Sequence, residues 1–230
     1  MSHPTKKIVR AWSDGLKDAG FRLNGSSLQR EAGILRHNIT LQRSQRVAPG
    51  KIRINLYLSI RDDFIDPPDF VSCLHGSVGQ KKAEFGDDES WWEEGRLVSS
   101  GLSALCKHGL CWFDKFGKDT KVLAGWLERA ITERVSIRDL VEERSRAHPE
   151  IENMIAPYLI GRGRNAPADY RMFLSILKFD QGQLEIACQY AQAFLESIRR
   201  REVAFSNEPE RTLRQLRKMG CVKSSSDAIH

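Results

Sequence analysis

The sequence predicts an α+β fold, in which an N-terminal helix lies on an antiparallel β-meander and a mostly helical C-terminal half follows. Apolar residues recur every four residues near the N-terminus, two segments between residues 35 and 60 alternate apolar and polar residues, and helical periodicity returns beyond residue 102. The change to purely helical patterns near residue 135 divides the chain into three parts. These are an α+β domain (1–134), a helical extension or subdomain (135–221) and a flexible tail (222–230).

The first predicted element is an amphipathic helix. Ile8, Trp12 and Leu16 recur every four residues and form one apolar stripe. Gly20 follows where a helix commonly ends in a left-handed cap, a conformation that glycine adopts without steric strain. We therefore expect this helix to cover a sheet with its stripe and to end before Gly20.

Two strands are predicted next, over residues 35–42 and 51–60, and in each strand every second side chain shares a face. The aliphatic set, expected to face the helix, is Leu35, Ile39, Leu41, Ile52, Ile54, Leu56, Leu58 and Ile60. The outward set is Arg36, Asn38, Thr40, Gln42, Lys51, Arg53, Asn55, Tyr57 and Ser59. His37 falls in the inward set, where we expect a neutral histidine bonded at the edge of the core, with a catalytic histidine as the alternative.

The remaining segments are less regular at first and then helical. Residues 61–90 combine a Pro-Pro pair, glycines and acidic clusters, which favours loops with at most short strands, and residues 90–97 favour an edge strand. Leu102, Leu105, Cys106 and Phe113 are expected on one face of a helix. Further helices are predicted near 122–131, 137–147, 149–160, 167–178, 181–203 and 208–219.

The overall composition excludes several classes of protein. Hydrophobic residues make up 40% and charged residues 29% of the 230 residues, which is typical of a folded globular chain. Neither a run of about 18 apolar residues nor a signal sequence is present, so we expect a cytoplasmic protein without a membrane partner. Five scattered cysteines indicate reduced thiols, and the net charge of +6 mildly favours an acidic partner.

Three short motifs occur in order in the first half of the chain. They are a Leu-x-x-x-Gly-Phe helix end (Leu16, Gly20, Phe21), a Gln-x-Ser element in an Asn/Gln-rich strand (Asn38, Gln42, Ser44), and an Asn-Leu pair in the next strand (Asn55, Leu56). With these motifs, the first half resembles the domain-of-unknown-function family 4304. The resemblance implies an α+β fold of bacterial origin without established catalysis, and a role as an immunity protein encoded beside a toxin.

Signatures of catalysis and metal binding are missing from the sequence. The common nucleotide-binding, metalloprotease and hydrolase motifs are absent. Cys73, His75 and Ser77 lie too close in sequence for the usual nucleophile and base arrangement. On a helix Cys106 and Cys111 point about 140° apart, so we interpret them as buried or half-buried structural thiols. The acidic clusters lack calcium-loop spacing. We therefore expect no catalytic residue, metal or cofactor.

The polar side of the two predicted strands is the main candidate binding surface. Amide and guanidinium groups with one tyrosine suit recognition of another protein, although most such faces are simply hydrated. The candidate partner-binding residues on the strands are Arg36, Asn38, Gln42, Arg53, Asn55 and Tyr57. Trp91 and Trp92 are added because neighbours on a strand point to opposite faces, so that one is core and the other an exposed interface anchor.

Two functional hypotheses follow from these patterns. The first is a non-catalytic protein-binding module, specifically a bacterial immunity protein that binds and neutralises a cognate toxin. The alternative is a nucleic-acid-binding protein that uses basic C-terminal helices, because arginine stripes can contact phosphates. The residues proposed for that role are Arg199, Arg200, Arg201, Arg214 and Arg217. An arginine-rich helix end also complements its own dipole, which requires no ligand.

Overall fold

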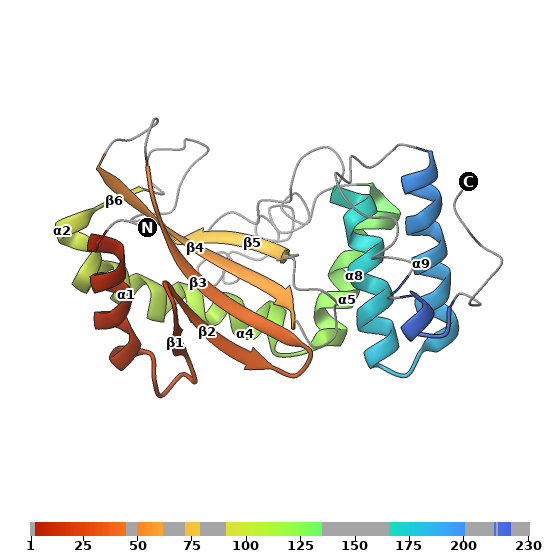
Figure 1. Ribbon diagram of the computed structural model, residues 1–230, viewed down its shortest axis with the longest axis horizontal. Helices are drawn as coiled ribbons and strands as arrows, with labels where there is room; N and C mark the ends of the chain where they lie inside the picture. Colours follow the sequence, from red (N-terminus) through yellow and green to blue (C-terminus); the bar gives the residue numbers. More distant parts are fainter. Residues whose placement is uncertain are drawn as a thin grey trace.

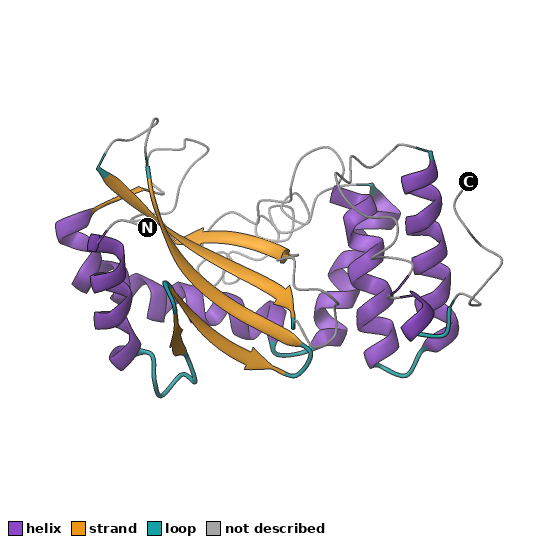
Figure 2. Cartoon of the chain, in the orientation of Figure 1, coloured by secondary structure: helices purple, strands orange, loops and turns teal. Residues whose placement is uncertain are grey.

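A computed structural model describes residues 3–44, 50–61, 72–78, 91–134, 166–200, 214 and 216–221. It confirms the α+β fold: an N-terminal helix and an antiparallel sheet are followed by a mostly helical half (Figures 1 and 2). The predicted boundary near residue 135, the predicted helices at 137–147 and 149–160, and the tail 222–230 lie outside the described residues.

The sheet is antiparallel throughout, with the strand order β1-β2-β3-β4-β5 and β6 beside the beginning of β4. Its strands are β1 (Arg22–Asn24), β2 (Ser27–Ala32), β3 (Leu35–Arg43), β4 (Lys51–Ile60), β5 (Ser72–Val78) and β6 (Trp91–Glu93). The pairing of β3 with β4 runs without interruption from Leu35 opposite Ile60 to Arg43 opposite Ile52. The aliphatic residues predicted to face inward on β3 and β4 are all at most 5% exposed, because helices cover that side of the sheet.

The N-terminal helix α1 (His3–Gly15) covers part of the apolar side of the sheet. Ile8, Trp12 and Leu16 are buried, which confirms the predicted stripe. The indole Nε1 of Trp12 donates a hydrogen bond to the carbonyl oxygen of Val98 at 3.1 Å and so joins α1 to the next helical layer. Gly20 has a φ of +82°, a left-handed conformation that favours glycine and turns the chain into β1.

A single helical rod between residues 94 and 117 alternates α-helical and π-helical turns beneath the sheet. Its parts are α2 (Glu94–Arg96), a π segment (Leu97–Gly101), α3 (Leu102–Ala104), a second π segment (Leu105–Gly109) and α4 (Leu110–Gly117). Every fourth residue is buried: Leu97, Gly101, Leu105, Gly109, Phe113 and Gly117. A four-residue repeat drifts around an α-helix of 3.6 residues per turn, and the wider π turns offset that drift.

Glycines let this rod approach the sheet closely. A β-carbon at Gly109 would lie 2.5 Å from Cδ1 of Leu105 and 3.5 Å from Cδ1 of Leu56 on β4. The four-residue repeat also corrects one prediction made for this helix. Cys106, expected on the buried face at a 3.6-residue period, is exposed, as is Cys111, so the interpretation of both as buried thiols is wrong.

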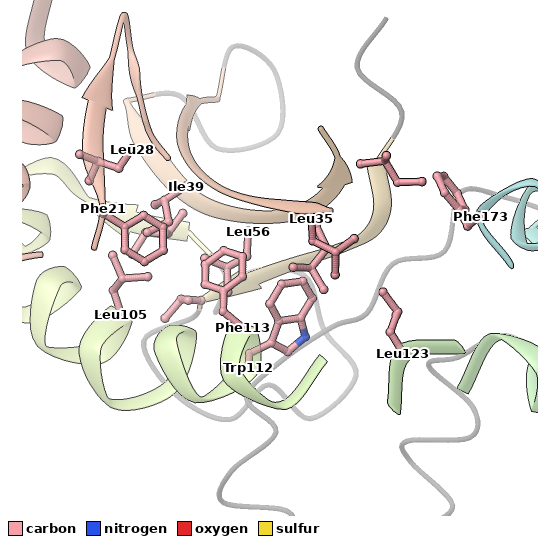
Figure 3. Packing of buried hydrophobic residues seen from close by; sticks show 14 of the residues in the cluster. Phe21, Leu28, Leu35, Ile39, Leu56, Leu105, Trp112, Phe113, Leu123 and Phe173 are labelled. Atoms are coloured by element: carbon pink, nitrogen blue, oxygen red, sulfur yellow. The ribbon is translucent and has the colours of Figure 1, made fainter. Parts of the chain in front are cut away.

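Three helices pack side by side in the second half: α5 (Thr120–Glu133), α8 (Ala166–Asp180) and α9 (Leu184–Arg199), with α8 against both others (Figure 1). One hydrophobic cluster extends from the sheet through Phe113 on α4 to Leu123 on α5 and Phe173 on α8 (Figure 3). Although we assigned α5 to the first domain, it packs with the C-terminal helices. The division into domains stays a prediction.

A disulfide joins Cys188 on α9 to Cys221, with their Cα atoms 4.9 Å apart. Our expectation of reduced thiols is therefore wrong for this pair. The chain returns to α9 because Leu216 packs on Ala191 and Leu195, and this small cluster brings Cys221 beside the second turn of the helix. Residues 33 positions apart in sequence meet through this packing, which their spacing alone does not reveal.

Candidate binding surface

The sheet surface, defined as the outward side chains of β3 and β4, forms as predicted from two adjacent strands. Asn38 lies opposite Tyr57, and Gln42 lies opposite Arg53. The members of this surface are Arg36, Asn38, Thr40, Gln42, Lys51, Arg53, Asn55, Tyr57 and Ser59. Gln42 is exposed and Arg53 and Tyr57 are half-buried, so these side chains are accessible in part to a partner.

Two predicted partner-binding residues do not reach solvent. Asn38 is 1% and Asn55 is 2% exposed, which contradicts the expectation that both amides face outward to water. The amide nitrogen of Asn38 donates to the Ser59 hydroxyl at 3.0 Å, and that of Asn55 donates to Oε1 of Gln42 at 3.1 Å. These bonds satisfy the buried amide nitrogens, whereas Oδ1 of Asn38 is buried without a hydrogen-bond partner among the described residues. Asn38 and Asn55 therefore support the surface from within, and we no longer expect them to contact a partner directly.

The two tryptophans are also buried, so the expectation that one of them is an exposed anchor is wrong. Trp92 is 3% exposed, lies on the apolar side of the sheet opposite Ile52, and donates its Nε1 hydrogen to the Val78 carbonyl oxygen at 2.7 Å. Trp91 is 6% exposed and lies on the outward side opposite Arg53. The guanidinium carbon of Arg53 sits 4.3 Å from the Trp91 ring centroid, which explains how the ring is covered.

This stacked arginine is the most distinctive group of the sheet surface. The guanidinium is half-buried, and no described carboxylate forms an ion pair with it. Its Nε is buried without a hydrogen-bond acceptor. By contrast, the neighbouring cations Arg36 and Lys51 lie 3.8 and 3.6 Å from Glu31 and Glu93. Stacking fixes the plane of the guanidinium, so its donors are oriented before any partner arrives.

His37 forms a buried network on the other side of β3. Its Nδ1 accepts hydrogen bonds from Nε and Nη2 of Arg30 at 3.1 and 3.0 Å, so the ring proton resides on Nε2, 3.2 Å from the Gly117 carbonyl oxygen. The ring stacks on Phe113 with centroids 4.7 Å apart. Burial, followed by the charge of Arg30, lowers the pKa of His37 from 6.5 to about 4. The predicted neutral core histidine is confirmed.

Arg30 and Asp114 complete this network, and sequence reasoning missed both. Nη2 of Arg30 lies 2.9 Å from Oδ1 of Asp114, and its Nη1 donates to the Ala19 carbonyl oxygen at 3.1 Å. The guanidinium therefore connects the turn after α1, strand β3 and helix α4. Alternation places Arg30 opposite His37, and this pairing was the signal available in the sequence. With both ring nitrogens bonded and no exposed surface, His37 has a structural role here.

The other sequence candidates remain without a described site. The side chains of Cys73, His75 and Ser77 and the acidic residues at 62–69 and 87–89 lie outside the described side chains, and the remaining acids Glu93 and Glu94 lie near Lys51 and Arg43. Within the described ranges, no group of three His, Cys, Asp or Glu residues could hold a metal ion. None of the helices in those ranges has both the length and the apolar composition of a membrane span.

The basic residues of the C-terminal region lie at two places in the described chain. Arg200 follows the last turn of α9 and lies 3.9 Å from Glu196. Arg214 and Arg217 belong to the segment that packs on α9 through Leu216. Arg214 and Arg217 are exposed, and the side chains of Arg199 and Arg201 lie outside the described set.

Comparison with known proteins does not assign the chain to a family. No family model, curated protein or solved structure matches the chain. The resemblance to family 4304 therefore stays a prediction.

Proposed function

We propose that the chain is a non-catalytic protein-binding module that engages its partner through the sheet surface. The observation that carries this proposal is the Arg53 guanidinium, stacked 4.3 Å above Trp91 and without a described carboxylate partner. Arginine, tyrosine and tryptophan are the residues most often responsible for the binding energy of protein interfaces. Here all three lie on the outward side of the sheet, with the tryptophan supporting the arginine and the tyrosine about 13 Å further along β4.

The chemistry of the surface favours an acidic partner. A half-buried guanidinium without an acceptor gains most from a carboxylate or carbonyl oxygen, which can accept two of its parallel donors. Tyr57 and Gln42 lie on the same two strands and add an aromatic group and an amide. The chain's net charge of +6 would also speed the approach of an acidic protein surface.

In its most specific form, the proposal is that the partner is a bacterial toxin encoded beside this chain and that binding neutralises the toxin. The motif resemblance in residues 8–60 supports this form by analogy. The test is co-expression of the chain with the product of the adjacent reading frame, followed by co-purification and by a growth assay. A stable complex together with growth rescue is expected; an adjacent product that neither binds nor harms growth would count against it.

Variants of the surface separate this proposal from general charge attraction. Arg53→Gln removes the stacked guanidinium, and Arg22→Gln removes an exposed arginine from the edge strand β1 with the same change in net charge. A charged hydrogen bond contributes about 1.5–3 kcal/mol, so the complex with Arg53→Gln should be about 10- to 100-fold weaker. Arg22→Gln should bind almost normally. Equal weakening in both variants would indicate non-specific attraction instead.

A further inference from the structure

A shallow groove lies along the helical rod, on the side adjacent to its sheet-facing residues. Its volume is about 600 Å³, and apart from Trp92 every lining residue comes from the rod. The lining consists of Trp92, Arg96, Ser99, Ser100, Ser103, Ala104, Lys107 and His108. From Arg96 onward these positions follow helical spacing and share one face, so the groove presents a single continuous row of polar groups.

Among the described residues, no carboxylate is paired with the cations of the groove. Between Gly95 and Phe113 the sequence contains no aspartate or glutamate. The two described acids just before this stretch are already engaged, since Glu93 lies 3.6 Å from Lys51 and Glu94 lies 3.9 Å from Arg43. In the described part of the chain, neither Arg96 nor Lys107 forms an ion pair, and both are exposed. An anion would therefore meet no carboxylate on the rod face.

Hydroxyl groups and widened helical turns complete the site. Ser99, Ser100 and Ser103 are exposed and can each donate a hydrogen bond into the groove. Four of the polar lining residues belong to the two π segments, at positions 99, 100, 107 and 108. Such segments are rare and are frequently found at functional sites. In this rod they keep the glycines against the sheet while turning serines and cations into the groove.

We propose that this groove binds a soluble diphosphate ester, with the phosphate oxygens held by Arg96, Lys107 and the serine hydroxyls. Arg96 and Lys107 are eleven residues apart, about 16 Å along the rod, so each cation contacts a different phosphate group and the serine hydroxyls donate between them. The volume lies within the range of about 300–1,000 Å³ found for small-molecule sites. Trp92 is buried, so the groove supplies no exposed ring for stacking, and recognition rests on the phosphate.

This site is independent of the proposed protein-binding surface. The rod packs on the apolar side of the sheet through Gly109 and Gly117, whereas the sheet surface is formed by the outward residues of β3 and β4. Loss of phosphate binding should therefore leave partner binding unchanged. Failure of one proposal would not imply failure of the other.

The test measures binding of ADP, pyrophosphate and adenosine by isothermal titration calorimetry to four proteins. Besides the native chain and the single variant Arg96→Gln, these are the groove pair Arg96→Gln/Lys107→Gln and the control pair Arg22→Gln/Lys121→Gln. The control pair removes the same charge from exposed positions outside the groove. We expect ADP and pyrophosphate to bind and adenosine not to bind. Affinity should fall about tenfold for each groove cation removed and stay unchanged in the control pair.

Three results would overturn the assignment. The first is the absence of binding by both phosphate compounds to the native chain, and the second is an equal loss of affinity in the two pairs. The third is tight binding of duplex DNA that is lost in the groove pair while ADP does not bind, which would indicate a nucleic-acid backbone as the ligand. Because the replaced side chains are exposed, the thermal unfolding midpoint of each variant should match that of the native chain.

Discussion

Protonation of His37 provides a quantitative test of the buried network. The ring is fully buried, accepts two hydrogen bonds from Arg30 at Nδ1 and donates from Nε2 to the Gly117 carbonyl oxygen. A second ring proton would have to be placed on Nδ1, where it would face a guanidinium. Folding should therefore oppose protonation of this histidine, in agreement with a pKa lowered from 6.5 to about 4.

The size of the effect follows from the difference between the two pKa values. As the pH falls below 6.5, the unfolded chain binds a proton at His37 while the folded chain does not, until the pH approaches about 4. The contribution to stability is thus complete above pH 6.5 and is lost progressively between the two values. At 1.36 kcal/mol per pKa unit, the full loss is about 3 kcal/mol, of which about 2 kcal/mol should be reached by pH 4.5.

The assay is urea unfolding at pH 7 and pH 4.5 for the native chain and for His37→Gln, whose side chain does not titrate. Glutamine can still donate a hydrogen bond, which limits the disturbance at neutral pH. The free energy of unfolding of the native chain should decrease by about 2 kcal/mol more than that of the variant. Parallel pH profiles would refute the reasoning. If the variant does not fold, titration of the His37 ring by NMR in the native chain gives the same answer, with a midpoint near 6.5 contradicting it.

Two further predictions concern the packing of the rod and the disulfide. Gly117→Ala should destabilise the fold by about 1–3 kcal/mol, because the new β-carbon would lie 2.3 Å from Nε2 of His37. Gly125→Ala is the matched control, since nothing lies within 4 Å of that β-carbon on α5, and it should raise stability by about 0.5–1 kcal/mol; equal effects in thermal unfolding would contradict the packing. Cys221→Ser should cost about 3–4 kcal/mol by releasing the link to Cys188 across 33 residues. An unchanged unfolding midpoint with and without a reducing agent would contradict a disulfide in the native chain.

The strand pattern was sufficient to predict which residues share a face, but not their register. Alternation in the segments 35–42 and 51–60 placed Gln42 and Arg53 on the same outward face, and the structure adds that they lie opposite each other. Alternation does not determine how deeply each polar residue lies. That depth depends on hydrogen bonds between side chains, such as Asn38 with Ser59, and on groups packed around them, which a period of two does not encode.

The helical rod was predicted as a helix only from Leu102 onward: residues 94–97, expected to continue an edge strand, are helical, and the geometry of the rod was not predicted. The repeat of Leu97, Gly101, Leu105 and Gly109 at four-residue intervals is visible in the sequence. Interpreted with the 3.6-residue period of an α-helix, it favoured Cys106 for the buried face. Only the π turns, which lengthen the local period, align the glycines with the sheet. The groove beside them was missed for the same reason.

Contacts between distant segments account for the remaining differences. The Cys188–Cys221 disulfide depends on Leu216 packing against α9, and the stack of Arg53 on Trp91 depends on β6 joining the beginning of β4. In both cases, a later part of the chain packs against an element from which it is separated by many residues in sequence. Local periodicity carries no information on where such a return ends.

The proposed function requires that the outward side of β3 and β4 contacts a protein partner. The most direct measurement is NMR chemical-shift mapping of the labelled chain during titration with the unlabelled product of the adjacent reading frame. We expect the largest changes at Gln42, Arg53 and Tyr57 and at the indole of Trp91. Changes confined to α8 and α9, or the absence of any change, would contradict it.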